Sequence, residues 1–189
     1  MKIVLFADLK AENWHSMDRY AECVARCLQT YGSNGRQIEL FWPDRADRRS
    51  DDQRVVKTRP FVENARLGFA RYVAYCWQAR AARGELNHVL DHTYAHVVHF
   101  LPPERTIVTC HDLDALALGW KNRTLPGRAV SAWARRGLVK AARIITVSEN
   151  TRQDVIRLLG FQPEHVRAVH HGVPPEFSPT AGAEDPDWR

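Results

Sequence analysis

Short apolar runs alternate along the chain with longer segments of amphipathic pattern. The runs are rich in valine and isoleucine, as expected of buried parallel strands. We predict strands at residues 3–7, 38–42, 89–90, 106–110, 144–147 and 165–169, and helices at residues 17–31, 61–83, 94–101 and 126–142 and after Ser148. Strands joined by helical crossovers lie parallel in one sheet. The pattern therefore predicts an α/β fold: a Rossmann-like, doubly wound, mostly parallel sheet with helices on both faces.

Each predicted helix has one apolar face, which should pack on the sheet. These faces comprise Tyr20, Val24, Cys27 and Leu28 in the first helix, Ala65, Phe69, Tyr72, Cys76 and Ala79 in the second, and Val130, Trp133, Gly137, Leu138 and Ala141 in the helix at 126–142. Residues 45–59 have almost no apolar content and are predicted to form a surface loop.

The helix after residue 147 has recognisable signals at both ends. Ser148 or Thr151 is expected to cap its N-terminus, and Thr151 with Asp154 has the spacing of a capping box. Gly160 stands where a helix C-cap takes a positive φ. The unit from residue 144 to residue 169 is thus predicted to be strand, helix and strand.

Polar residues follow most of the predicted strands directly. Because the carboxyl ends of parallel strands share one edge, where open α/β sheets bind ligands, we expect these residues to converge near one crevice. They are Asp8, His92, His111, Asp112, Ser148 and His171. Each of the Asp and Ser residues, taken singly, is equally well interpreted as a helix cap.

Composition and charge narrow the class of protein. A chain of 189 residues with 44% hydrophobic content suits one ordinary domain, and no apolar run approaches the roughly 20 residues of a membrane helix. Residues 3–7 form a strand rather than the apolar core of a secretion signal, so we expect a cytoplasmic protein. Four cysteines without a CxxC pair are expected to be reduced core thiols: Cys23, Cys27, Cys76 and Cys110.

The net charge of +5 comes from basic residues clustered in two predicted helices. Arg66, Arg71, Arg80 and Arg83 recur in the first cluster, and the second spans residues 121–143 without a carboxylate. Solvated helix faces and a surface for anionic lipid, which would place the protein peripherally on the inner face of a membrane, both fit this pattern. Nucleic acid is not expected, because no binding motif or aromatic-basic platform is present.

Four segments together resemble the N-terminal domain of a family 4 glycosyltransferase, a retaining enzyme family of the GT-B fold. They are Asp8 with SMDRY at residues 16–20, VTCHDL at 108–113, ITVSENTRQD at 145–154, and VHHGV at 169–173 leading to FSP at 177–179. The resemblance covers nearly the whole chain. The third and fourth segments, at their usual separation, are the most specific part of it.

This resemblance implies a hexosyltransferase-type enzyme that uses a nucleotide-sugar donor and an acceptor glycan or lipid and needs no metal or other cofactor. By the likeness His111 is the catalytic candidate and touches the transferred sugar. Substrate-binding candidates are Asp8, Ser16 and Met17 near the donor phosphates, His92 and Asp112 in the cleft, Ser148 at the helix bordering it, and His171 and Gly172 on the interdomain side. A free helix N-terminus at Ser16 suits a diphosphate, and a neutral histidine suits a hydrogen bond to a sugar.

The sequence departs from the family pattern in two places. Residues 10–17 contain none of the glycines that bring the backbone close to the donor in many relatives, although Trp14 or His15 could stack on a ligand. Residues 1–179 are expected to form the acceptor-side domain and residues 180–189 the start of a linker, with the C-terminal donor domain absent. The 189-residue chain alone is therefore expected to be inactive.

Three other interpretations were weighed. A metal site at His88, His92, His96 and His99 is disfavoured because the strand around residues 89–91 prevents the four from sharing a helix face. Asp91 and Asp112 could form the general acid and base of an inverting enzyme or a hydrolase. The principal alternative is a non-catalytic module that binds an acceptor or a membrane and is completed by a separate donor-binding chain.

Overall fold

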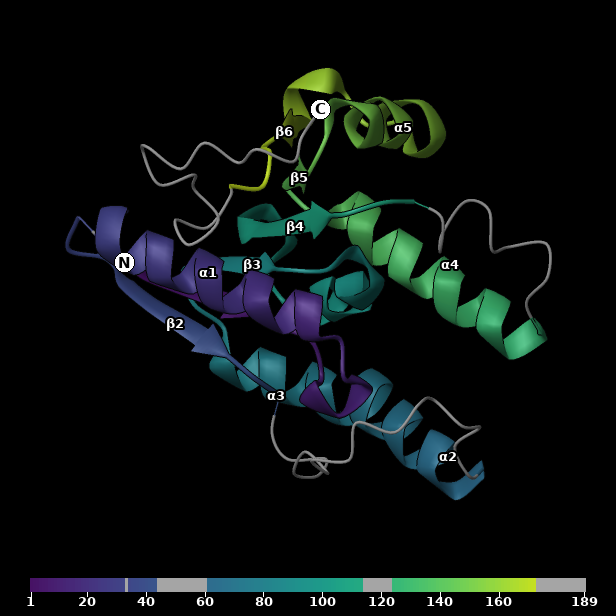
Figure 1. The fold of residues 1–189 in the computed structure, drawn as a ribbon. Coiled ribbons are helices and arrows are strands. Elements are labelled where there is room, and N and C mark those ends of the chain that lie inside the picture. Colours follow the sequence, from purple (N-terminus) through teal and green to yellow (C-terminus); the bar gives the residue numbers. More distant parts are fainter. Residues whose placement is uncertain (33, 44–60, 114–123, 173–189) are drawn as a thin grey trace, which may run out of the picture.

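The computed structural model describes residues 1–32, 34–43, 61–113 and 124–172. Within these residues six strands form one sheet in the order β2-β1-β3-β4-β5-β6, and every neighbouring pair is parallel (Figure 1). The strands are β1 (Lys2–Phe6), β2 (Gln37–Phe41), β3 (Leu86–Val89), β4 (Thr106–Cys110), β5 (Arg143–Thr146) and β6 (Val166–Ala168). All six predicted strands are confirmed, and so is the α/β fold class.

The helices also fall where the apolar periodicity places them. They are α1 (His15–Tyr31), α2 (Phe61–Phe69), α3 (Tyr75–Ala82), α4 (Leu125–Lys140) and α5 (Glu149–Leu159). The long helix predicted at residues 61–83 is continuous but contains a π-helical turn, η2 (Ala70–Ala74), between α2 and α3. The helix predicted at 94–101 is the 3-10 helix η3 (His92–Phe100), and shorter 3-10 turns are η1 (Lys10–Glu12), η4 (Pro103–Arg105) and η7 (Pro163–His165).

The two faces of the sheet carry different helices (Figure 1). Since successive strand residues point to opposite faces, Ile3 and Leu5 pack under α1, while Val4 and Phe6 pack on the other side. The second side carries the larger core, to which α3, η3, α4 and α5 all contribute. This distribution follows from right-handed crossovers, because the chain moves one way along the sheet through α1 and the other way afterwards.

Leu138 and Ala141 of the predicted inner face of α4 belong to the core that contains Val108 and Ile144 of the sheet, and the helix also packs closely on η3. The backbone of Gly137 lies so close to Ala95 that a Cβ at this position would overlap the Ala95 carbonyl oxygen. Trp133, predicted to face the sheet, stacks instead on His99 of η3, with ring centroids 5.9 Å apart.

Four residues predicted to be buried are exposed: Cys23, Cys27, Ala65 and Phe69. Cys23 and Cys27 lie on the outer side of α1, because Asp18, Ala21 and Ala25 form its buried stripe. Phe69 is 63% exposed, since the inward side of the π turn and α3 is taken by Tyr75, Cys76 and Ala79. The prediction of core thiols is therefore correct for Cys76 and Cys110 and wrong for the α1 pair.

Parts of three predictions fall outside the described residues: the loop at 45–59, the basic segment from 121 to 123, and everything after Gly172, including the linker at 180–189. In the part of the chain that is described, none of the helices combines the length and the apolar character needed to cross a bilayer.

Candidate functional site

A cavity of about 350 Å³ opens at the carboxyl edge of the sheet, beyond the ends of β1, β3 and β4. Five segments enclose it: the segment from β1 to the start of α1, the π turn η2, the start of η3, the segment after β4, and the middle of α4. The lining residues are Asp8, Glu12, Trp14, Met17, Arg71, Tyr72, Asp91, His92, Thr93, His111, Asp112, Val130, Ser131 and Ala134.

Two buried carboxyl groups, Asp8 after β1 and Asp91 before η3, form the floor of this cavity. Burial, and then the charge of Asp91 and a hydrogen bond with it, raises the pKa of Asp8 to about 9. Burial acts on Asp91 in the same sense, but the His92 side chain and two hydrogen bonds from Thr93 outweigh it and hold the pKa of Asp91 below its usual range. At neutral pH the pair thus shares one proton, with Asp8 neutral and Asp91 ionised.

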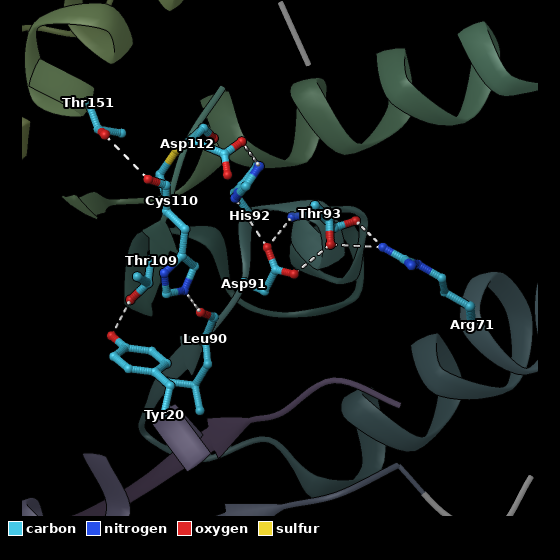
Figure 2. A network of polar contacts seen from close by, with 11 residues as sticks. Tyr20, Arg71, Leu90, Asp91, His92, Thr93, Thr109, Cys110, Asp112 and Thr151 are labelled. Atoms are coloured by element: carbon cyan, nitrogen blue, oxygen red, sulfur yellow. Dashed lines mark hydrogen bonds and ion pairs between the residues drawn. The ribbon is translucent and has the colours of Figure 1, made fainter. Parts of the chain in front are cut away.

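His92 lies between the carboxylates of Asp91 and Asp112, as Figure 2 shows. Its Nδ1 is 3.1 Å from Asp91 Oδ1 and its Nε2 is 3.9 Å from Asp112 Oδ1, yet neither contact has the alignment of a hydrogen bond. The ring is 3% exposed. His92 therefore connects the buried carboxyl pair to the exposed carboxylate of Asp112 at the cavity wall.

Arg71 enters the cavity from η2 and binds both walls. Its Nη1 donates to Glu12 Oε1 and Oε2 at 2.7 and 2.8 Å. Its Nη2 donates to the carbonyl and hydroxyl oxygens of Thr93 at 3.0 and 2.9 Å, and Figure 2 shows Arg71 beside Thr93. The guanidinium also stacks on Tyr94, 4.0 Å from the ring centroid. Such a bidentate, stacked arginine fixes geometry as well as charge. Arg71 therefore links the turn after β1 to the start of η3.

The segment after β1 is held in place by two tyrosine hydroxyls. Tyr75 donates to the Ala7 carbonyl at 2.6 Å, and the backbone N–H of Leu9 donates to the Tyr94 hydroxyl at 3.1 Å. The turn that follows ends in Asn13, which adopts a left-handed φ of 57°. Asparagine tolerates this conformation better than most residues, so the turn forms although it contains no glycine.

His111 follows β4 and has a defined tautomer. Its Nε2 lies 3.0 Å from the Leu90 carbonyl, which can only accept, so Nε2 carries the proton. Burial outweighs this contact and lowers the pKa of His111 below its ordinary value. A neutral ring with a protonated Nε2 leaves Nδ1 as an acceptor. The histidine can thus accept a hydrogen bond from a hydroxyl at Nδ1.

Two rings, those of Tyr20 and His171, pack against the His111 ring. Tyr20 of α1 contacts it edge-on at a centroid distance of 4.9 Å, and His171 stacks on Tyr20 at 4.9 Å and meets His111 at 5.6 Å. The Tyr20 hydroxyl is 3.3 Å from Thr109 Oγ1, which also contacts His88 Nε2 at 2.8 Å. These contacts fix the orientation of the His111 ring at the cavity wall.

Ser148 is the N-cap of α5, and this role accounts for a polar residue directly after β5. Its Oγ accepts from the backbone N–H of Thr151 at 3.1 Å, so Ser148 is the N-cap and the predicted capping box of Thr151 with Asp154 is wrong. The hydroxyl of Thr151 instead donates to the His111 carbonyl at 3.3 Å. Gly160 ends the helix with a φ of 74°, as predicted. The start of α5 thus supports the segment that carries His111 from outside the cavity.

The structure brings together five of the predicted site residues and separates the other four. Asp8, Met17, His92, His111 and Asp112 line the cavity. The remaining residues, Ser16, Ser148, His171 and Gly172, do not line it, although His171 contacts the outer side of His111. Helix α1 begins at His15, with Trp14 as its N-cap, so Ser16 lies within the first turn and is exposed.

Sequence reasoning missed Arg71, Glu12 and Thr93. Arg71 was grouped with the solvated arginines of its helix, but it is the member of that group that faces inward. No local signal in the sequence separates Arg71 from Arg66 and Arg80, which are also flanked by apolar residues. Trp14, suggested as a stacking residue, does line the cavity and is 60% exposed.

The four closely spaced histidines have separate surroundings. His88 belongs to β3 and bonds Thr109, whereas His96 and His99 of η3 contact the backbone carbonyls of Arg71 and Trp133. Among the described residues no three His, Cys, Asp or Glu side chains are grouped as metal ligands.

The model of Glycosyltransferase Family 4 matches residues 17–177, most of the chain and all of the elements from α1 to β6. A search of curated proteins gave no significant match.

Proposed function

This chain belongs to glycosyltransferase family 4, and from that premise we propose that it forms the acceptor side of a cleft in which a sugar passes from a nucleotide-sugar donor to an acceptor with retention of anomeric configuration. One observation carries the proposal. In a chain of this family, the cavity at the carboxyl edge combines a hydrogen-bonding histidine, a carboxyl pair and a buried arginine with an aromatic ring at its mouth.

His111 is the proposed contact to the transferred sugar. Its Nδ1 is free to accept a hydrogen bond from a sugar hydroxyl, because Nε2 is committed to Leu90. The contacts with Tyr20 and the support from Thr151 hold the ring in one orientation. A pre-oriented acceptor costs little reorganisation when the sugar reaches the transition state.

The charges of the cavity favour an uncharged, hydroxyl-bearing acceptor group. Glu12 neutralises Arg71, Asp8 is already neutral, and Asp91 and Asp112 add negative charge. A phosphate or carboxylate would be repelled here, whereas sugar hydroxyls can donate to the carboxylates and a pyranose ring can lie against Trp14. We therefore place Asp8 on the acceptor side of the cleft and not beside the donor phosphates.

The same charges imply that the donor diphosphate is bound elsewhere. Arg71, the one arginine among the described residues that line the cavity, is already paired with Glu12, so it is not available to neutralise a leaving diphosphate. We infer that a second domain supplies those groups. Residues 1–189 by themselves are then expected to bind sugar nucleotides weakly and to transfer no sugar.

Radiolabelled transfer assays test this function. The product of the complete open reading frame is incubated with a panel of nucleotide sugars and with matched neutral and phosphorylated glycoside acceptors. We expect transfer to the neutral acceptors, retained anomeric configuration in the product and no loss of rate with a chelator. Preference for the phosphorylated acceptors would contradict the charge argument, and turnover by residues 1–189 alone would contradict the need for a second domain.

A further inference from the structure

The long helix formed by α2, η2 and α3 has an outward face on which three large apolar side chains are exposed. Phe69 is 63% exposed, Val73 42% and Trp77 64%. Their spacing of four residues places them along one side of the helix, opposite the core residues Tyr75 and Ala79. An aromatic and apolar stripe of this kind is uncommon on a helix that faces only water.

Positive charge flanks this stripe. Arg66 and Arg80 are exposed on the same side of the helix, one near each end of the stripe. No Asp or Glu occurs between Glu63 and Glu85, so the face carries no compensating carboxylate of its own. We use the name outward face for these five residues: Arg66, Phe69, Val73, Trp77 and Arg80.

We propose that the outward face is a docking surface for an anionic lipid bilayer. Apolar and aromatic side chains enter the boundary between headgroups and acyl chains, and arginines beside them bind the lipid phosphates. Tryptophan suits this boundary because its ring is apolar while its indole N–H remains hydrated. The helix lies in the plane of the membrane surface and does not cross it.

Charge favours a bilayer over a second copy of the chain. In a two-fold contact through this face, the exposed arginines of both copies would be brought together around the apolar stripe. Like charges in such a contact are unfavourable and slow the encounter. A surface of anionic lipid complements the same arginines, which is why it is the occupant we infer.

The outward face and the cavity lie on opposite sides of one helix. Arg71 and Tyr72, between Phe69 and Val73 in the sequence, line the cavity. A helix with its side chains is about 10 Å across, so the bilayer surface lies about that far from the cavity wall.

Vesicle co-sedimentation of the 189-residue chain tests the proposal without any need for sugar transfer. The vesicles contain phosphatidylcholine alone or mixed with phosphatidylglycerol, at low and high salt. We expect binding to the anionic vesicles at low salt and a reduction of about tenfold or more in the F69S/W77S variant, since burying each large apolar side chain contributes substantially to partitioning. The control V139S removes a similar apolar side chain, 49% exposed, from the basic outer side of α4.

A second pair of substitutions separates charge from apolar contact. R66E/R80E should lose binding to anionic vesicles and show a weaker dependence on salt. Circular dichroism melting verifies that every variant is folded. Equal binding by F69S/W77S and the wild type, or a loss with V139S instead, would overturn the assignment. So would the absence of wild-type binding, or a dimer in sedimentation velocity that F69S/W77S abolishes.

Discussion

Replacing Asp8 by asparagine should stabilise the protein, and increasingly so as the pH rises. In the folded chain Asp8 is 5% exposed, and burial together with Asp91 raises its pKa to about 9, against an ordinary value of 3.8. A carboxyl whose pKa is raised on folding contributes most to stability below its unfolded pKa, and this contribution is lost as the pH rises towards the folded pKa. Asparagine is neutral in both states and has no such loss.

The magnitude follows from linkage. Between pH 5 and pH 8 the unfolded Asp8 is ionised and the folded Asp8 is protonated, so each pH unit costs the wild type up to about 1.4 kcal/mol relative to the Asp8→Asn variant. Over three units the advantage of the variant should grow by at most about 4 kcal/mol. The asparagine amide can still donate a hydrogen bond to Asp91, so the local geometry is expected to persist.

Urea unfolding at pH 5, 6.5 and 8 measures this difference. Other groups with shifted pKa values also make stability depend on pH: burial lowers the pKa of His88 and of His96 to about 4. Both proteins contain these histidines, so the histidine contributions to the free energy of unfolding cancel when the variant is compared with the wild type at each pH. Asp154→Asn on the surface of α5 is a matched control for the chemical change. A stability difference that stays constant from pH 5 to pH 8 would refute the assignment of a protonated Asp8.

Three further substitutions have expected outcomes. His111→Ala should lower sugar transfer by the complete enzyme about 100-fold or more with only a small change in Tm; normal activity per folded molecule would make the residue purely structural. Ser148→Ala removes the α5 cap and should cost about 1 kcal/mol in urea unfolding, whereas Thr124→Ala, at an α4 N-cap whose side chain makes no cap bond, should cost little; equal costs would contradict this. Gly137→Ala should destabilise by about 3 kcal/mol or more because its methyl overlaps η3, while Gly160→Ala, in open space at positive φ, should cost only about 1 kcal/mol; the reverse order would contradict the close contact.

The sheet and the polar residues at its edge were predictable because both depend on local signals. Runs such as residues 106–110 and 144–147 specify buried strands through their β-branched residues, and alternation along the chain specifies parallel pairing. Asp8, His92 and His111 then follow from the rule that strand carboxyl ends converge. The groups that contact these three side chains in the cavity do not follow from this rule.

The inward direction of Arg71 was not predictable from local signals. In the sequence it resembles Arg66 and Arg80, and which of the three faces the cavity depends on the π turn and on how the helix packs against η3. The raised pKa of Asp8 also depends on a contact between residues 83 positions apart, Asp8 and Asp91. The tautomer of His111 likewise required the position of the Leu90 carbonyl.

The π turn at Ala70–Ala74 makes this helix sensitive to the deletion of a single residue. Hydrogen bonds from residue i to i+5 accommodate one residue more than an α-helix would over the same rise. Deleting one residue there would restore a regular α-helix, while α2 and α3 would keep nearly the same rotation relative to each other. The side chains of the turn itself, Arg71 among them, would change position, so a one-residue gap in an alignment at this point would mark relatives with a different cavity wall.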